Sequence, residues 1–279
     1  MGHLISFWGL QKGQTGNTSS FIGSAAMMGL DYETHILAAQ SDTSSAVLEN
    51  VFRKTGIKNE ESNFNSIGYD ALENLVRSGQ LSPSNFKDYA TPVLGNHLDI
   101  LSSSAKQQSH SDLARVRDVI EKICSNALPA YDLTLFDVTS GSKDFSENEM
   151  DNQVLNLSDL IVVSLNQNKS VLENFFENTV NELQDKNYII LLGQYDQFSR
   201  WNEKNISRLF KVKKPIFVVP HNASYMDALN ENKIIEFFLK RKNINKDDTD
   251  FGFINAIRNV NKGILRSIEI DHKMISREA

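Results

Sequence analysis

The sequence predicts an α/β protein with a doubly wound, mostly parallel sheet and helices on both faces. Apolar runs of strand length alternate with amphipathic segments of helix length along the chain. Most of these runs are apolar on both faces, as expected for parallel strands covered on each side. The first run ends near Trp8 and leads through a glycine-punctuated loop into a helix start rich in small residues. That order is typical of a loop that holds phosphates.

The elements follow in chain order. The expected strands are Leu4–Trp8, His35–Ala39, Leu98–Leu101, Leu133–Asp137, Leu160–Leu165, Tyr188–Leu192 and Ile216–Val219. The expected helices between them are Thr18–Leu30, Ser111–Asn126, Ser170–Asp185, Glu203–Phe210 and Ala228–Lys240. Right-handed crossovers through these helices would place the carboxyl ends of the strands, and the loop after the first one, at the ligand-binding edge of the sheet.

Two regions fit the alternation less well. Residues 51–91 are polar, with a helical stretch near Tyr69–Arg77, and we interpret them as an insertion packed on one edge of the sheet. Residues 251–270 carry apolar side chains at helical spacing with basic residues among them. This segment is either a terminal helix docked on the sheet, which we favour, or an amphipathic helix that contacts a membrane. No repeat or low-complexity linker divides the chain, so we expect a single domain over 1–279.

Composition narrows the class of protein. The 279 residues are 40% hydrophobic, enough for a sizeable core, and the net charge of −6 argues against a protein that coats nucleic acid. Cys124 is the only cysteine, which excludes an internal disulfide. No apolar stretch is long enough for a membrane helix, and the first residues read as a core strand. We therefore expect a cytoplasmic protein. The histidines show no metal-ligand spacing, and no nucleophile elbow is present.

The loop after the first strand carries the most specific signal. Gly13 and Gly16 let the backbone approach a phosphate that a β-carbon would keep away. Lys12-Gly13-Gln14-Thr15-Gly16-Asn17-Thr18 resembles the deviant Walker A loop, K-G-G-x-G-K-[ST], of the ParA/MinD family of ATPases. The alternative is a strand-turn-helix loop without a ligand.

The resemblance implies a P-loop NTPase fold with ATP and Mg²⁺ as ligands. It places Gly13, Gln14, Thr15, Gly16, Asn17, Thr18 and Ser19 around the phosphates, with the Thr18 hydroxyl on Mg²⁺. It also implies a nucleotide-dependent homodimer. In that dimer Lys12, at the position of the family's signature lysine, would reach across to the partner's nucleotide.

The loop departs from the family pattern at two positions. Gln14 replaces a glycine, which narrows the path to the phosphates, and Asn17 replaces the lysine that touches the β- and γ-phosphates. Phosphoryl transfer depends mainly on positioning and charge stabilisation, so losing that lysine removes several kcal/mol of transition-state stabilisation. The sequence does not establish whether ATP is hydrolysed.

Two further segments are similar to the switch regions of that family. Tyr131–Gly141 resembles the D-x-x-x-G segment, which implies that Asp137 accepts a water bound to Mg²⁺; the alternative is an ordinary strand end. After the second strand, Gln40 replaces the first aspartate of a D-x-D pair and Asp42 aligns with the second. The resemblance implies that Asp42 orients the attacking water or the metal. It could equally cap a helix that begins near Ser44.

The base-binding segments are less distinct. Gly193–Asp196 occupies the place of a base-recognition segment but lacks its asparagine, so the choice between adenine and guanine stays open. Phe217–Asn222 is similar to the I-P-x-[DN] segment that borders the adenine, which implies a base contact for Pro220; a simple turn is the alternative.

In its loss of motif residues, the sequence is most similar to the TadZ/CpaE-type branch of this family, which serves pilus assembly. The resemblance implies a slow or inactive ATP-dependent switch that dimerises and positions a cellular machine such as a pilus or secretion system. A scaffold that no longer hydrolyses nucleotide is the alternative, and a ParA-like DNA segregation factor ranks third. The protein partner, the pathway and the oligomeric state without nucleotide are not specified by the sequence.

Overall fold

The computed structural model describes residues 2–43, 45–52, 67–104, 113–141, 149–271, 273 and 275–277. Its strands are β1 (His3–Gly9), β2 (Ile36–Gln40), β3 (Thr91–Pro92), β4 (Leu98–Ile100), β5 (Leu133–Val138), β6 (Leu160–Leu165), β7 (Tyr188–Tyr195) and β8 (Ile216–Pro220). They form one sheet in the order β3-β4-β2-β5-β1-β6-β7-β8. Every neighbouring pair is parallel except β3 with β4, which is antiparallel. The predicted fold class is therefore confirmed.

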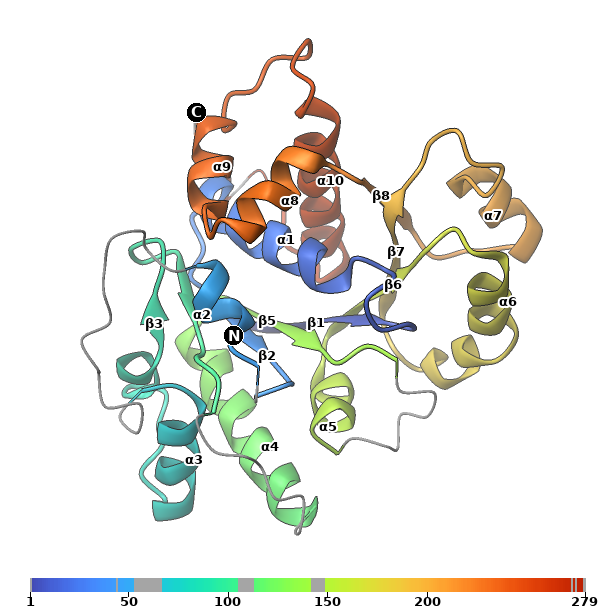
Figure 1. The fold of residues 1–279 in the computed structure, drawn as a ribbon. Helices are drawn as coiled ribbons and strands as arrows, with labels where there is room; N and C mark the ends of the chain where they lie inside the picture. The colour runs from blue at the N-terminus through green and yellow to red at the C-terminus, as the bar shows by residue number, and fades with distance from the viewer. Residues whose placement is uncertain are drawn as a thin grey trace.

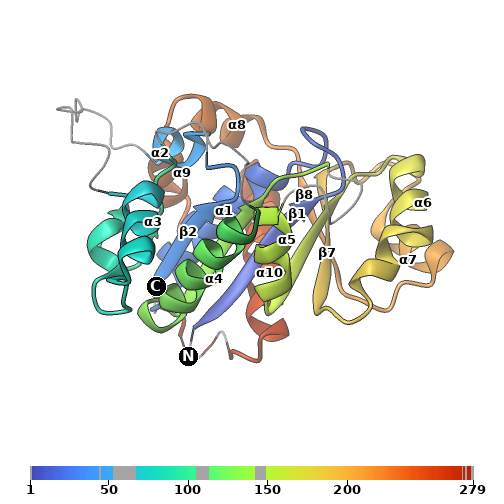
Figure 2. The same cartoon turned by 90° about the horizontal axis from the view of Figure 1, so that it is seen from below.

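Helices cover both faces of this sheet (Figure 1). One face carries α1 (Asn17–Asp31), α8 (Ala223–Asn230), α9 (Ile234–Lys240) and α10 (Phe251–Ser267). The other carries α3 (Tyr69–Ser78), α4 (Leu113–Ala130), α5 (Glu149–Leu157), α6 (Lys169–Glu177) and α7 (Glu203–Phe210). The short α2 (Val47–Val51) follows β2, and two 3₁₀ turns lie at Phe86–Tyr89 and Thr179–Leu183. Figure 2 shows the second helical layer from its own side.

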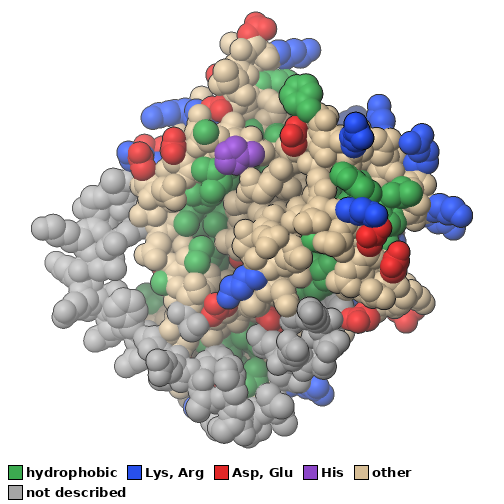
Figure 3. Space-filling view, turned by 45° about the vertical axis from the view of Figure 1, so that its right-hand side comes forward, with side chains coloured by type: hydrophobic (Ala, Val, Ile, Leu, Met, Phe, Trp, Pro, Cys, Tyr) green, Lys and Arg blue, Asp and Glu red, His purple; other side chains and the backbone are tan. Residues whose placement is uncertain are grey.

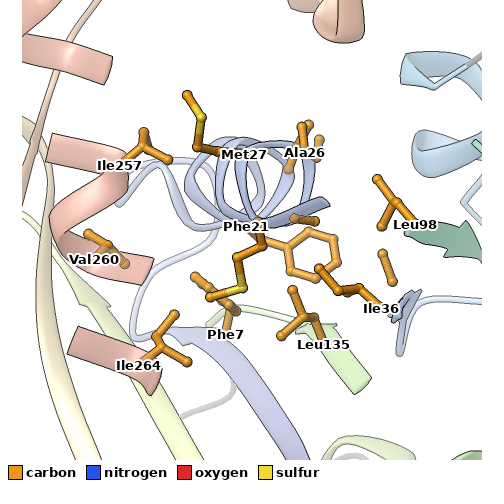
Figure 4. Close-up of a cluster of buried hydrophobic side chains, with 14 of the residues drawn as sticks. Phe7, Phe21, Ala26, Met27, Ile36, Leu98, Leu135, Ile257, Val260 and Ile264 are labelled. Carbon is orange, nitrogen blue, oxygen red and sulfur yellow. The ribbon is translucent and has the colours of Figure 1, made fainter. Parts of the chain in front are cut away.

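Alternating strand residues build two separate cores, because successive side chains point to opposite faces. Ile5 and Phe7 belong to the core under α1 and α10, whereas Leu4 and Trp8 belong to the core under α4 and α5. Figure 4 shows α1 beside α10 over the strands, with Phe21 directed toward the sheet. The Phe21 and Phe7 rings meet edge to face, 5.5 Å between centroids. This packing fixes the start of α1, and with it the glycine-punctuated loop.

Several predicted boundaries were wrong. The helix predicted at Ala228–Lys240 is two helices, because α8 begins earlier, where Asn222 accepts a hydrogen bond from the Tyr225 amide, 2.7 Å. Asn232 then takes a left-handed conformation that separates α8 from α9. The Ser170–Asp185 helix ends at Glu177 and continues as a 3₁₀ turn. The helix considered as an alternative near Ser44 corresponds to the short α2, which begins at Val47. Helix α5 and strand β3 were not predicted.

Of the two regions that fitted the alternation poorly, the described part of residues 51–91 lies at one edge of the sheet, whereas residues 251–270 include a helix that packs into the core. Helix α3 packs against α4, and β3 adds an antiparallel edge to the sheet beside β4. Residues 53–66 of the predicted insertion, Ser44 and the predicted helix start at Ser111 lie outside the described residues. The C-terminal segment is α10, whose apolar side chains, Ile257 and Ile264 among them, are buried against α1 and β8. This agrees with docking. Within the described ranges, no helix combines the length and apolar character needed to span a bilayer.

Candidate functional site

The candidate site lies at the carboxyl edge of the central strands. Strand β1 sits between β5 and β6. The chain runs from β1 to β2 on one side of it, and later crosses from β5 to β6 on its other side. Such a switch in strand order leaves a crevice outside the strand ends. The segments that follow β1, β2 and β5 converge there and line a cavity of about 370 Å³.

The loop after β1 is held in a shape that only small residues permit. Gly13 and Gly16 have φ values of 74° and 64°, in the left-handed region. A β-carbon on Gly193 of β7 would lie 1.9 Å from the Thr15 carbonyl oxygen, so the loop packs directly on that strand. Gly16 precedes α1 as its N-cap, and the first N–H groups of the helix have no partner within it. Anions are favoured at such a terminus.

The cavity is lined by most of the residues that the sequence singled out. These are Lys12, Gly13, Thr15, Gly16, Asn17, Thr18 and Ser19 from the loop, Asp42 from the segment after β2, and Asp137 from the end of β5. Lys12 is exposed and is the only basic residue among the described lining residues. A β-carbon on Gly141 would lie 3.2 Å from the Lys12 backbone nitrogen, so the segment after β5 passes close beside the loop.

Asn17 is directed into the protein. Its amide nitrogen donates to the Phe7 carbonyl oxygen (3.1 Å) and to Asp137 Oδ1 (2.7 Å), and its carbonyl oxygen accepts from Ser164 Oγ (2.6 Å). The residue is 5% exposed. The side chain is thus engaged with β1, β5 and β6, and only the backbone N–H of Asn17 is left to meet a phosphate.

Asp137 and Thr18 are hydrogen-bonded to each other and line the cavity. The Thr18 hydroxyl donates to Asp137 Oδ2 (2.7 Å), while Oδ1 takes the Asn17 amide. Burial raises the pKa of Asp137 to about 7. The two hydrogen bonds oppose that rise, and the charges of Asp151 and Asp42 add to it. No cation contacts the carboxylate among the described residues.

The hydroxyl and carboxylate oxygens of Thr18 and Asp137 fit a magnesium ion in character. Mg²⁺ prefers oxygen ligands and is usually held by one or two carboxylates together with waters and substrate phosphates. Within the described part of the chain, no cluster of three or more His, Cys, Asp or Glu side chains forms a self-sufficient metal site. Thr18 and Asp137 are therefore suited to Mg²⁺ that binds together with a phosphate group, which would supply further oxygen ligands.

The segment after β2 is shaped by Gln40. Its amide donates to the backbone oxygens of Asp42 (2.7 Å) and Ser45, which fixes the turn that carries Asp42 into the cavity. Helix α2 begins at Val47 with Ala46 as N-cap, and no side chain caps it. The interpretation of Asp42 as a helix cap was therefore wrong.

Comparison with solved structures relates this arrangement to known proteins. The chain is similar to a protein named as a plasmid partition protein from Borrelia burgdorferi B31, bound to AMPPNP (TM-score 0.64, 17% identity, 95% of this chain and 99% of that one). The septum site-determining protein MinD of Pyrococcus horikoshii OT3, complexed with Mg-ADP, matches with TM-score 0.64 and 18% identity over 97% and 100%. A ParA family ATPase from Chlorobium tepidum TLS matches with TM-score 0.66 and 17% identity over 94% and 98%.

The fold is that of the ParA and MinD ATPases. At these sequence identities the structural similarity establishes the fold alone. Any activity has to be inferred from the residues of the site. No family model matches the sequence, and no curated protein matches it.

Two predicted residues do not line the main cavity of this ParA/MinD fold. Gln14 is exposed and lies outside the lining, so it does not narrow the cavity. Pro220 borders a separate hollow of about 10 Å³, together with Gln194, His221 and Tyr225. A space of that size holds about one water molecule, so a base would enter only if these side chains moved.

Sequence reasoning missed Ser164 and Met226, which shape the site, and it named Gln194 only as part of the Gly193–Asp196 segment. Ser164 anchors Asn17, and its signal was a lone polar residue in the apolar strand Leu160–Leu165. Gln194 lines both cavities, has a left-handed φ of 52° and hydrogen-bonds His221 Nδ1 through Oε1 (3.0 Å). The feature that sets Gln194 apart is the register shift at the end of β7, which cannot be read from the sequence. Met226 of α8 reaches the cavity from a distant part of the chain.

Proposed function

We propose that this protein is a nucleotide-binding switch of the ParA/MinD type whose hydrolysis is slow or absent. The observation that carries the proposal is the orientation of Asn17. Its side chain donates to Asp137 and to the Phe7 carbonyl in the protein interior and is itself neutral. The position that holds a lysine in that family thus supplies no charge to the cavity. The loop, the helix start and the Thr18–Asp137 pair still line a cavity suited to phosphates, which supports the proposal.

The ligands of the proposed site are ATP and Mg²⁺. The plasmid partition protein and the MinD to which the fold is similar were crystallised with AMPPNP and with Mg-ADP. Backbone N–H groups from Gly13 to Ser19 would hold the phosphates, and Thr18 and Asp137 would hold the metal with its waters. Bound Mg²⁺ would neutralise phosphate charge and favour the ionised form of Asp137.

Turnover in this site would be weak for an electrostatic reason. Lys12 is the only basic residue among the described lining residues, and Asp42 and Asp137 add negative charge. Phosphoryl transfer is accelerated mainly by positive charge placed around the transferred group. We propose that Lys12 supplies this charge to a second copy of the chain in a nucleotide-dependent homodimer, in which Asp42 orients the attacking water. A slow switch of this kind suits positioning or assembly of a cellular machine, for example a pilus or secretion system, through a protein partner.

Titration calorimetry with ATP and Mg²⁺ tests the nucleotide site. Gly13→Val is the test variant and Gly79→Val is its control, because both glycines have a left-handed φ near 70° and open space around the β-carbon position. Only Gly13 lines the cavity. We expect micromolar binding to wild type and to the Gly79 variant, and none to the Gly13 variant. Equal binding by all three proteins would show that the ligand binds elsewhere.

A scaffold that keeps the fold without using nucleotide is the second candidate. The 10 Å³ hollow beside Pro220 favours it, since no base fits there as the side chains stand. ATPase assays on Asn17→Lys separate the two candidates. A nucleotide switch predicts that the restored charge raises hydrolysis above that of wild type. A scaffold predicts no ATP binding by calorimetry and no hydrolysis by either protein.

A further inference from the structure

The segment from residue 200 to 214 has an unusual charge for this acidic chain. It contains six Lys and Arg residues and a single acidic one, Glu203, whereas the whole protein has a net charge of −6. Five of the six basic residues are exposed, and they are Arg200, Lys204, Arg208, Lys211 and Lys213. We call these exposed basic residues, together with exposed Phe198 and Leu209 of the same region of the chain, the α7 surface.

Helix α7 is oriented so that its basic side faces solvent. Ile206 is fully buried, and the Phe210 ring stacks on Phe176 of α6 at 4.5 Å between centroids. Lys204, Arg208 and Lys211 follow at spacings of four and three residues and therefore lie along the opposite side of the helix. In Figure 3, Lys and Arg side chains gather beside hydrophobic ones at the right-hand side, where Figure 1 draws α7.

The positive charge of this face is not neutralised within the described chain. No carboxylate lies within ion-pair distance of the five exposed basic residues in the described part of the structure. Glu203 accepts a hydrogen bond from the Tyr195 hydroxyl, and Asp196 accepts one from the Phe198 amide at 2.9 Å. The two nearest carboxylates in the sequence are thus committed to local structure.

Two apolar side chains stand out of the same segment. Phe198 is 87% exposed and Leu209 is 59% exposed, the highest values among the large hydrophobic residues of the described chain. Phe198 sits in a turn that Gln167 fixes by accepting from the Asp196 amide (2.7 Å) and donating to the Asp196 carbonyl (3.0 Å). These two hydrogen bonds hold the turn in a conformation that presents Phe198 to solvent, close in sequence to the exposed basic residues.

We propose that the α7 surface is a peripheral binding site for an anionic lipid bilayer. Unpaired lysines and arginines would meet the lipid headgroups, while Phe198 and Leu209 would enter the boundary between headgroups and acyl chains. An acidic peptide would use the charge but would leave Phe198 and Leu209 exposed unless it also carried apolar side chains. Duplex DNA, whose bases are stacked and paired, would use the charge but not the exposed phenylalanine and leucine.

The α7 surface is separate from the nucleotide site. Helix α7 follows β7 and packs on the edge strand β8, whereas the cavity is lined mainly by the segments after β1, β2 and β5 and takes only Gln194 from β7. Figures 1 and 2 show α7 with α6 at one end of the sheet, away from α2 and α3. Lipid binding therefore does not depend on the proposed nucleotide function.

Flotation with vesicles tests this proposal on the full-length protein. Vesicles of phosphatidylcholine with one third phosphatidylglycerol should carry the protein, and vesicles of phosphatidylcholine alone should not. Binding should weaken as salt is raised, because screening shortens the reach of the surface charges. Failure to bind the anionic vesicles at low salt would overturn the proposal.

Two matched pairs of variants identify the surface. Lys204→Gln combined with Arg208→Gln should lower vesicle affinity roughly thirtyfold, from the typical contribution of two basic residues near an anionic surface. Lys240→Gln with Lys246→Gln, which removes the same charge from another exposed region, should leave the affinity within about twofold. Phe198→Ser should weaken binding severalfold, whereas Leu239→Ser, at an exposed leucine of α9, should not.

The same variants separate lipid from the other polyanions. The variants should keep the circular dichroism and melting temperature of wild type, so that a loss of binding is not a loss of fold. Equal losses in the test and control variants would overturn the assignment to α7. Tighter binding to duplex DNA or to polyglutamate than to anionic vesicles, insensitive to Phe198→Ser, would also overturn it in favour of that partner.

Discussion

Replacing Asn17 by alanine should destabilise the protein by about 4 kcal/mol at pH 8. The side chain makes one hydrogen bond to a carboxylate, which contributes roughly 2 kcal/mol, and two neutral ones of about 1 kcal/mol each. All three partners lie in or beside the core, so water replaces the lost bonds poorly. Alanine's better helix propensity at the first position of α1 offsets only a few tenths of a kcal/mol.

The pH dependence of this loss distinguishes its cause. The Asn17 amide lowers the pKa of Asp137, so removing it should raise that pKa above about 7. The loss of stability should therefore be larger at pH 8, where the carboxylate is ionised, than at pH 5, where it is protonated. A cavity effect alone would be independent of pH.

Urea denaturation in EDTA measures the effect, with Asn261→Ala as control. Asn261 is also a buried asparagine in a helix, but it makes a single hydrogen bond, from Nδ2 to the Ser24 carbonyl at 3.2 Å. We expect Asn261→Ala to cost about 3 kcal/mol less than Asn17→Ala. The reasoning is refuted if the two variants lose equal stability, or if the Asn17 variant loses the same amount at both pH values.

Three more predictions follow from single contacts. The pKa of Asp137 is raised from 3.8 to about 7, so the folded state holds a proton that the unfolded state releases, and stability falls as pH rises from about 4 to 7. Asp137→Asn should flatten this fall by roughly 1–3 kcal/mol in EDTA melts. Burial raises the pKa of Cys124 to about 12, so its thiol should react with Ellman's reagent only at the rate of unfolding. In α10, Gly252→Ala should be neutral or raise the melting temperature. Gly263→Ala should lower it, because the new β-carbon would lie 2.1 Å from the Phe217 ring.

The sequence predicted the sheet because its strands are continuous apolar runs. Leu160–Leu165 and Glu203–Phe210 were predicted to the residue, since the first is fully apolar apart from Ser164 and the second places apolar Ile206 and Phe210 four residues apart, on one side of a helix. Helix α5 and the α8–α9 break were missed. Short helices depend on caps such as Asn222 and on packing against neighbours that local sequence does not identify. The single-domain organisation stays a prediction.

The sequence by itself determined where a phosphate could be held. A strand, a loop with Gly13 and Gly16, and a helix start follow one another in the chain, and their geometry is local. Only the tertiary structure decided what Asn17 does. Its partners, Phe7, Asp137 and Ser164, belong to three different strands, and their contact depends on the order of β5, β1 and β6 in the sheet. Hydrogen bonds between residues 120 or 147 positions apart leave no periodicity in the sequence, so only the packed sheet reveals them.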